Sequence, residues 1–388
     1  MRRVYLDHNA TTPVRPEVAG AMRPCFGPLF GNPNSIHAVG REARAAVGEA
    51  RARAAALIGA ADPEEILFTS GGTESDNLAL RGALAAAGGG GHIVTAAVEH
   101  HAVLDTCKAL ESERVRVTYL PPDRAGRVSP EAVAGAIRPD TRLVSVMWGN
   151  NEVGTLQPVA EIAALCRGRG VPFHTDAVQA LGKVPMRVRE LGVDFLSASG
   201  HKINGPKGAG FLYVRQGARL APLLTGGGQE RDMRPGTENV AGIVGLGEAC
   251  RLAREEGPAL ARALAALRDR LEREVCERVP DVVVNGDPAR RLPGTANLSF
   301  LGAEGETLLI RLDLEGIAVS TGSACSAGST EPSHVLVAMG LAPEAIRGSL
   351  RFSLGWGSEE ADVDRLLEVL PEAVRKVRAM APGRGARR

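Results

Sequence analysis

The sequence predicts an α/β fold with a mostly parallel central sheet flanked by helices, followed by a smaller α+β domain. From about residue 66 to residue 214, short apolar runs alternate with helical segments rich in Ala, Leu and Glu, which is the pattern of strand–helix–strand units. Near residues 254–260 this alternation gives way to a helical stripe. The chain has 388 residues, enough for two domains with separate cores.

Six apolar runs are expected to form the strands of the large domain, and they lie at residues 66–69, 92–97, 143–147, 171–175, 195–198 and 210–214. The helix that follows has an apolar stripe at Leu260, Leu264, Leu267, Leu271 and Val275. Two further runs, 282–284 and 296–300, are expected as strands of the small domain. The apolar face of the last helix consists of Val363, Leu366, Leu370, Val374 and Val377. Pro371 is expected to kink or split that helix.

We therefore divide the chain into a large, cofactor-binding domain of residues 15–256 and a small domain of residues 1–14 and 257–388. The small domain carries a loop at about residues 320–334 that contains Cys325.

The composition argues against several classes of function. The formal net charge is +1 and aromatic residues make up 3%, so neither a field that attracts nucleic acid or an acidic membrane nor a base-stacking surface is expected. The first 13 residues lack the apolar core of a signal peptide, and no apolar run is long enough to span a bilayer. The six cysteines are scattered without a C-x-x-C pair, which favours reduced thiols in a cytoplasmic protein over disulfides or a zinc site.

Polar side chains follow the carboxyl ends of the predicted strands, the edge at which an open parallel sheet binds its ligands. The strand at 66–69 runs into a glycine turn and a helix start with Gly72 and Thr73. Backbone N–H groups there can cradle an anion, and a plain helix cap is the alternative. The later strand ends carry an imidazole, two amides, a carboxylate and a serine–histidine–lysine group, namely His100, Asn151, Gln179, Asp176, Ser199, His201 and Lys202.

Together these are the groups that pyridoxal 5′-phosphate requires. Its phosphate needs a cradle, its aldehyde needs an amine, and its pyridine nitrogen needs a carboxylate that keeps the ring protonated. The alternative is a metal site built from His100, His101, His174 and Asp176. That reading leaves Lys202 and the glycine turn without a role, so we expect no metal.

Lys202 is one of five lysines in the chain, the others being Lys108, Lys183, Lys207 and Lys376. Arginine stays protonated in proteins, whereas a buried lysine amine can become neutral and attack a carbonyl. A scarce lysine beside Ser, His and Gly, directly after an apolar run, indicates a Schiff-base lysine. A surface lysine in a turn is the alternative.

Cys325 and Arg351 are the candidates in the small domain. Cys325 lies among small residues, which are typical of a mobile loop from which a thiol can reach a substrate. An ordinary loop cysteine is the alternative. Arg351 stands at the start of an apolar run and could grip a substrate carboxylate, although an exposed charge is the commoner fate of an arginine.

Ordered motifs occur along nearly the whole chain, at residues 5–13, 31–37, 69–77, 99–105, 150–154, 174–179, 199–208, 234–239, 322–334 and 351–355. They resemble those of the cysteine desulfurases, members of the class V aminotransferase group of fold-type I pyridoxal-phosphate enzymes. The long segment rich in Gly and Ser around Cys325 is similar to that of the members that serve iron–sulfur or nitrogenase assembly.

The resemblance implies a role for each matching residue. Lys202 matches the lysine that binds the cofactor covalently as an aldimine, Cys325 the cysteine that becomes a persulfide, and His100 the imidazole that stacks on the ring and carries a proton. The phosphate binders are matched by Gly72, Thr73, Ser199, His201 and, from the second subunit of a homodimer, Thr237. Asp176 and Gln179 match the partners of the ring nitrogen and the ring hydroxyl. The substrate carboxylate is assigned to Asn151, Arg351 and Asn34.

The implied reaction removes sulfur from L-cysteine and gives L-alanine and a Cys325 persulfide for transfer to an acceptor. An iron–sulfur scaffold is the expected partner, and a transient contact of Cys325 with an iron–sulfur cluster is a further implication. Three alternatives stay open. They are selenocysteine lyase, an aminotransferase in which Cys325 would have no role, and a non-catalytic platform for iron–sulfur assembly, against which an intact Lys202, Cys325 and Arg351 argue.

Overall fold

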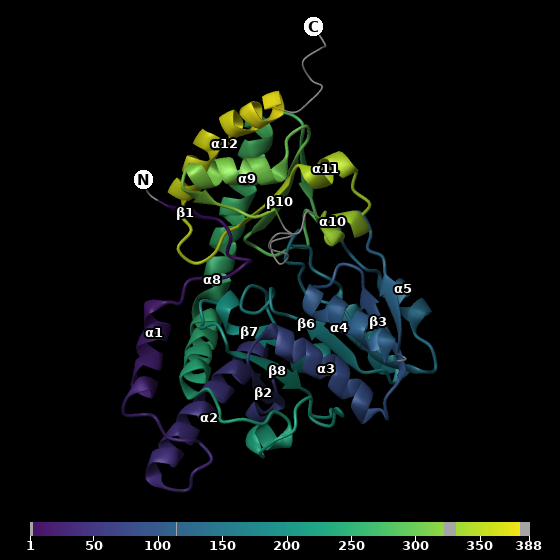
Figure 1. Cartoon of the computed structure of the whole chain (residues 1–388), viewed down its shortest axis with the longest axis vertical. Helices are drawn as coiled ribbons and strands as arrows, with labels where there is room; N and C mark the ends of the chain where they lie inside the picture. Colours follow the sequence, from purple (N-terminus) through teal and green to yellow (C-terminus); the bar gives the residue numbers. More distant parts are fainter. Residues whose placement is uncertain (1–2, 114, 322–330, 381–388) are drawn as a thin grey trace.

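The computed structural model describes residues 3–113, 115–321 and 331–380. They form a large lower part and a smaller upper part joined by one long helix (Figure 1). The segment 322–330 with Cys325, and the tail 381–388, lie outside the described residues. No helix in the described ranges has the length and apolarity needed to cross a membrane.

A seven-stranded sheet forms the centre of the large part, with strand order β2-β8-β7-β6-β5-β3-β4. All neighbours are parallel except at β8, which runs antiparallel to both β2 and β7. The strands are β2 (Ile66–Thr69), β3 (Gly91–Ala96), β4 (Val115–Leu120), β5 (Thr141–Ser145), β6 (Phe173–Asp176), β7 (Phe195–Ser199) and β8 (Gly210–Val214). This sheet confirms the predicted fold class and brings the carboxyl ends of β3, β5, β6 and β7 to one edge.

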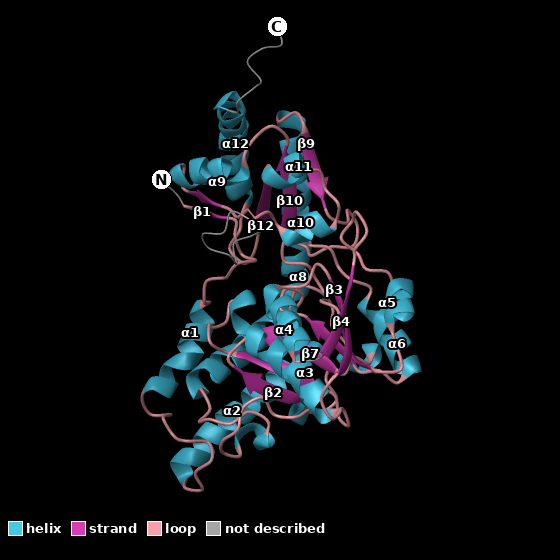
Figure 2. Ribbon diagram, turned by 45° about the vertical axis from the view of Figure 1, so that its right-hand side comes forward, coloured by secondary structure: helices cyan, strands magenta, loops and turns pink. Residues whose placement is uncertain are grey.

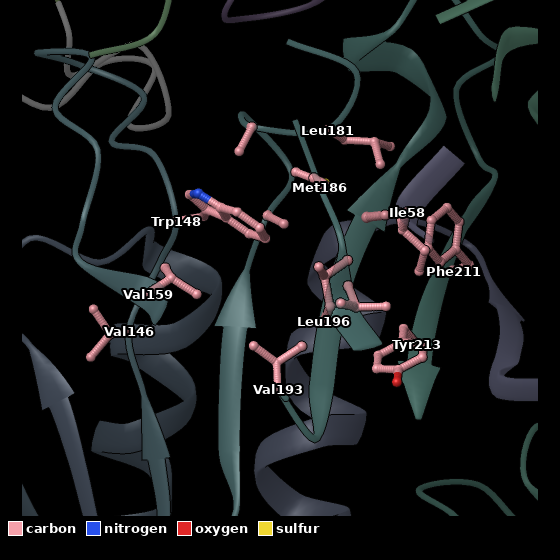
Figure 3. Packing of buried hydrophobic residues seen from close by; sticks show 14 of the residues in the cluster. Ile58, Val146, Trp148, Val159, Leu181, Met186, Val193, Leu196, Phe211 and Tyr213 are labelled. Carbon is pink, nitrogen blue, oxygen red and sulfur yellow. The ribbon is translucent and has the colours of Figure 1, made fainter. Parts of the chain in front are cut away.

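Helices cover both faces of the sheet. They are α1 (Pro16–Met22), α2 (Ala38–Ile58), α3 (Gly72–Ala86), α4 (His101–Ser112), α5 (Pro130–Ala136), α6 (Val159–Arg169), α7 (Val188–Leu191) and α8 (Val240–Arg278). Successive strand residues point to opposite faces, so Leu67 packs with α3 and α4, whereas Ile66 and Phe68 pack with α2, α6 and α8. Figure 3 shows part of the second cluster, where Phe211 lies beside Ile58.

The small part combines two short sheets with helices. An antiparallel sheet has the order β12-β10-β9, and β1 pairs in parallel with β11. The elements are β1 (Val4–Tyr5), β9 (Val282–Asn285), β10 (Thr295–Phe300), β11 (Ile317–Ala318), β12 (Ser349–Ser353), α9 (Gly305–Leu314), α10 (His334–Ala338), α11 (Pro343–Arg347) and α12 (Glu360–Met380). Val4 and Leu6 of the N-terminal segment belong to its core, and Figure 2 shows this segment rising from α1 to β1.

The structure departs from the sequence-based expectations in three places. The edge strand β4 is missed. The helix expected around residues 260–275 is the second half of α8, which has 39 residues. Its first half packs closely on α2, since a Cβ at Gly247 would lie 2.5 Å from Cα of Ala50. Pro371 lies inside α12, so the predicted split of that helix is wrong. The division of the chain after residue 256 falls within α8 and stays a prediction.

Candidate active site

The glycine turn between β2 and α3 forms one side of the site. α3 starts at Gly72, where a Cβ would lie only 2.7 Å from Cγ2 of Val178, so this close approach requires glycine. A Cβ at Gly71 would lie 3.6 Å from the Ser199 hydroxyl. Thr73 is exposed in the first turn of this helix, where backbone N–H groups lack helical partners. The turn therefore offers donors beside Ser199, an arrangement that suits an anion.

Asp176 and Gln179 lie at the end of β6. Oδ1 of Asp176 accepts a hydrogen bond from the N–H of Val178 at 2.9 Å. Burial raises the pKa of Asp176 to about 6, and this hydrogen bond and the positive charge of Lys202 oppose the rise. Gln179 donates from Nε2 to the carbonyl of Asn9 at 2.9 Å. The strand end thus holds a buried carboxylate close enough to Lys202 to feel its charge.

Lys202 lies in the 3₁₀ turn η3 (Gly200–Lys202), directly after Ser199, the last residue of β7. Its amine donates hydrogen bonds to the carbonyls of Asn9 and Ala10, the latter at 2.8 Å. Both acceptors belong to the N-terminal segment. The position of the amine is therefore set by a part of the chain that is distant in sequence.

Two imidazoles lie near Lys202. His100 caps α4, and its Nδ1 accepts from the N–H of Ala102 at 3.1 Å, which assigns the proton of the neutral ring to Nε2. Burial and the charge of Lys202 lower the pKa of His100 to about 4. Nδ1 of His201 lies 3.1 Å from Oγ1 of Thr11, and burial with nearby lysine charges lowers the pKa of His201 to about 4. Both rings are therefore neutral at neutral pH.

Arg351 enters the site from β12 of the small part and is 2% exposed. Its Nη1 donates to the carbonyl of Asn151 at 3.0 Å, and its Nη2 pairs with Oδ1 of Asp7 at 2.7 Å. Nε of Arg351 is buried without a hydrogen-bond partner. Two of the three residues assigned to the substrate carboxylate, Asn151 and Arg351, are thus in contact, and the guanidinium retains an unused donor.

Two predicted residues, Asn34 and Thr237, are not brought to this edge. Asn34 donates to Glu238 at 3.2 Å. The loop that holds it lies at the lower end of the molecule (Figure 1), whereas β12 lies in the upper part (Figure 2). Thr237 is exposed beside Glu238, before α8. Cys325 lies outside the described residues. The roles of Asn34 and Thr237 stay predictions, and the resemblance assigns Thr237 to the site of a second subunit.

Sequence reasoning misses Asp7, Asn9 and Lys183. Asp7 and Asn9 belong to the N-terminal segment, and the strand-end argument gives no signal for residues outside the sheet. The Lys183 amine donates to Oε1 of Gln179 at 3.1 Å, and burial lowers the pKa of Lys183 to about 7, with help from the charges of Lys202 and Arg351. The scarcity of lysine is the one signal that could have drawn attention to Lys183.

The metal alternative receives no support from the geometry. His174 lies between the hydroxyls of Ser145 and Ser197, at 2.8 Å from Nδ1 and 2.9 Å from Nε2. Within residues 3–113, 115–321 and 331–380, no three His, Cys, Asp or Glu side chains gather as metal ligands would.

The fold is that of a fold-type I pyridoxal-phosphate enzyme. Residues 4–366 match the family described as aminotransferase class-V. A cysteine desulfurase IscS of Methanosarcina thermophila is 52% identical over 382 residues, which make up 98% of this chain and 94% of the relative. The chain belongs to the aminotransferase class-V family and, within it, to the cysteine desulfurases.

Solved structures agree with this assignment. A NifS-like protein has a TM-score of 0.91 and 38% sequence identity, covering 97% of this chain and 100% of its own. A structure described as SspA in complex with cysteine has a TM-score of 0.81 and 38% identity, covering 90% and 98% of the two chains.

Proposed function

We propose that this protein is a pyridoxal-phosphate-dependent cysteine desulfurase that takes sulfur from L-cysteine, releases L-alanine and holds the sulfur as a persulfide on Cys325. One observation carries the proposal. An amine on Lys202, a buried carboxylate on Asp176 and a neutral imidazole on His100 converge at one sheet edge, and Arg351 reaches the same edge from the small part.

The residues present fit the cofactor. The glycine turn offers N–H donors beside Ser199, and a side chain at Gly71 would fill the space between them, as expected for a phosphate cradle formed by Gly72, Thr73, Ser199 and His201. We propose that Asp176 pairs with the pyridine nitrogen, that Gln179 bonds the ring hydroxyl and that His100 stacks on the ring. Lys202 is the proposed point of covalent attachment. When bound, the cofactor would act as an electron sink for the substrate α-carbon.

The chain's own groups would then act as follows. Arg351 and Asn151 hold the substrate carboxylate, for which a guanidinium is the preferred bidentate partner. The amine of Lys202 removes the α-proton, and His100, whose proton is on Nε2, can pass a proton within the site. The Cys325 thiolate forms a bond to the substrate sulfur while the bond between that sulfur and the β-carbon breaks. The β-carbon takes up a proton, equivalent to the one that the Cys325 thiol lost, and the α-carbon regains the proton removed from it, which gives alanine.

We also propose a homodimer in which Thr237 completes the phosphate site of the partner subunit. Large apolar side chains that are exposed in one chain support this homodimer, namely Phe26, Phe30, Ile36, Leu223 and Leu224.

The proposed sulfur acceptor is an iron–sulfur scaffold in the cytoplasm, with transient contact between Cys325 and the cluster. The names of the relatives support sulfur transfer, and co-purification with candidate acceptors would test the partner.

The decisive test compares two cysteine variants of the cofactor-loaded protein. Cys325→Ser should retain the visible absorbance of the bound cofactor but lose alanine formation by ~10³-fold or more, because the sulfur has no acceptor. Cys276→Ser is the matched control, since Cys276 is an exposed free thiol, and it should behave as wild type. Mass spectrometry should find the added sulfur on the peptide containing Cys325 only.

Alanine formation at the wild-type rate in Cys325→Ser would contradict the proposal. Lys202→Ala should abolish the absorbance that sodium borohydride removes from wild type. Comparing the rates of alanine formation from L-cysteine and from L-selenocysteine distinguishes a cysteine desulfurase from a selenocysteine lyase. Alanine release without added partner proteins excludes a non-catalytic platform.

A further inference from the structure

We propose that Asn9 is a positioning residue that holds the Lys202 amine and the Gln179 amide in place and links them to the Asn151–Arg351 pair. The inference rests on the proposed function, because it assigns Asn9 to the same site. Asn9 is 3% exposed and lies in the N-terminal segment, outside the three sheets. Its contacts reach five different segments of the chain.

The side chain of Asn9 is bonded at both of its polar atoms. Nδ2 donates to the carbonyl of Asn151 at 3.1 Å and to Oγ1 of Thr295 at 2.9 Å. Oδ1 accepts from the Lys183 amine at 3.4 Å. An amide can donate two hydrogen bonds and accept a third through one short side chain, which a hydroxyl with its single proton cannot do. A carboxylate would lose both donated bonds, and an aliphatic residue would lose all three.

The backbone N–H and carbonyl of Asn9 are also hydrogen-bonded, and the carbonyl bonds residues of the cofactor edge. Its N–H donates to Oγ of Ser353 at 2.9 Å. Its carbonyl accepts from Nε2 of Gln179 at 2.9 Å and from the amine of Lys202. Because the side chain and the N–H of Asn9 are both held by hydrogen bonds, they fix where its carbonyl meets Lys202.

The contacts of Asn9 join the two parts of the molecule. Thr295 and Ser353 are cross-strand partners on β10 and β12, whereas Lys202 and Gln179 belong to the large part. The carbonyl of Asn151 that accepts from Asn9 also accepts from Nη1 of Arg351. Asn9 therefore connects the proposed cofactor lysine, Lys202, with the Asn151–Arg351 pair proposed to bind the substrate carboxylate. Removing the Asn9 amide should weaken the binding of both cofactor and substrate.

The test uses Asn9→Ala together with a pair of variants at Thr295. Cofactor-free protein is titrated with pyridoxal 5′-phosphate to measure its Kd, and kcat and KM for L-cysteine are measured on loaded protein. Asn9→Ala should raise the Kd for the cofactor by ~10-fold and KM by a similar factor, which corresponds to the loss of about one net hydrogen bond at each end. Thr295→Val removes one acceptor and should move both quantities in the same direction by less.

Thr295→Ser keeps the hydroxyl and should restore both values to wild type, which a purely structural loss of packing would not produce. The double variant Asn9→Ala with Thr295→Val should match Asn9→Ala alone, because both changes break the same bond. Wild-type Kd and KM in Asn9→Ala would overturn the inference. If Asn9→Ala does not fold, equal Kd and KM in Thr295→Val and Thr295→Ser would overturn it instead. Wild-type protein that fails to bind the cofactor would refute the proposed function.

Discussion

At the scale of single residues, the site edge depends on ionisable groups that burial keeps neutral. His174 is fully buried between two hydroxyls, and burial lowers its pKa to about 3. Oδ1 of Asp76 lies 3.6 Å from Nε2 of His174 and has no hydrogen-bond partner. Burial raises the pKa of Asp76 well above its ordinary value, with Asp176 contributing repulsion. His174 is therefore neutral near pH 7, so it forms no ion pair with Asp76.

This neutrality predicts a pH dependence of stability. Between the ordinary pKa of 6.5 and about 3, the unfolded chain binds a proton at His174 that the folded chain does not, so stability falls as pH falls. His174→Gln should lose less stability between pH 6 and pH 4 than wild type, by about 1.4 kcal/mol per pH unit at most. Urea unfolding of the cofactor-free proteins measures this difference, and equal slopes would show that His174 is protonated in the folded state.

At the scale of elements, the start of α10 is fastened to the site edge. Ser333 caps this helix by accepting from the N–H of Leu336 at 3.2 Å, and its hydroxyl donates to Oε2 of Glu152 at 2.5 Å. His334 donates from Nε2 to the carbonyl of Glu99 at 2.9 Å. The chain that leaves the segment 322–330 is therefore tied to the loops that follow β3 and β5, the same loops that carry His100 and Asn151.

Removing the Ser333 hydroxyl should lower the free energy of unfolding more than removing an ordinary helix cap does. Ser333→Ala loses the cap and leaves a buried Glu152 oxygen without its donor, so we expect a loss of about 2–3 kcal/mol. Ser129→Ala is the control, because Ser129 is an exposed cap of α5 and its loss should cost about 1 kcal/mol. Equal shifts of the urea midpoint in the two variants would show that the Glu152 contact contributes nothing.

At the scale of the whole molecule, exposed apolar surface indicates where a second subunit would bind. Ile36 is 86% exposed and Phe30 is 74% exposed, in the loop that also carries Asn34. That loop is joined to the segment with Thr237 through Glu238. Single exposed apolar residues are ordinary, but several large ones beside two candidate site residues are typical of an interface.

A charge placed on this surface should therefore separate the subunits. We expect wild type to sediment as a dimer at micromolar concentration and Ile36→Glu to sediment mainly as a monomer with weaker cofactor retention, because burying an unpaired carboxylate is unfavourable. Leu314→Glu is the control, since Leu314 is 79% exposed on α9, in the small part, and should leave the dimer intact. A dimeric Ile36→Glu protein would place the interface elsewhere.

The sequence by itself determined the fold class and the core of the candidate site. Alternating apolar runs predicted a parallel sheet, and a parallel sheet brings its strand ends together, so Gly72, His100, Asp176 and Lys202 could be assigned to one edge before any contact was known. These residues follow their strands directly, which is why local patterns were sufficient. The edge strand β4 was missed because the polar residues Arg116 and Thr118 interrupt its apolar residues, and only Val115 and Leu120 in it are buried.

Only the tertiary structure decided what holds those groups in place. The bonds of Asn9 to Ser353 and to Thr295 join residues that are 344 and 286 positions apart, and the pairing of Arg351 with Asp7 also spans 344 positions. No local pattern encodes such contacts, because they depend on the N-terminal segment crossing between two separately packed cores. The chemical groups at the sheet edge can therefore be predicted from local sequence, whereas their positions depend on residues that come into contact only after folding.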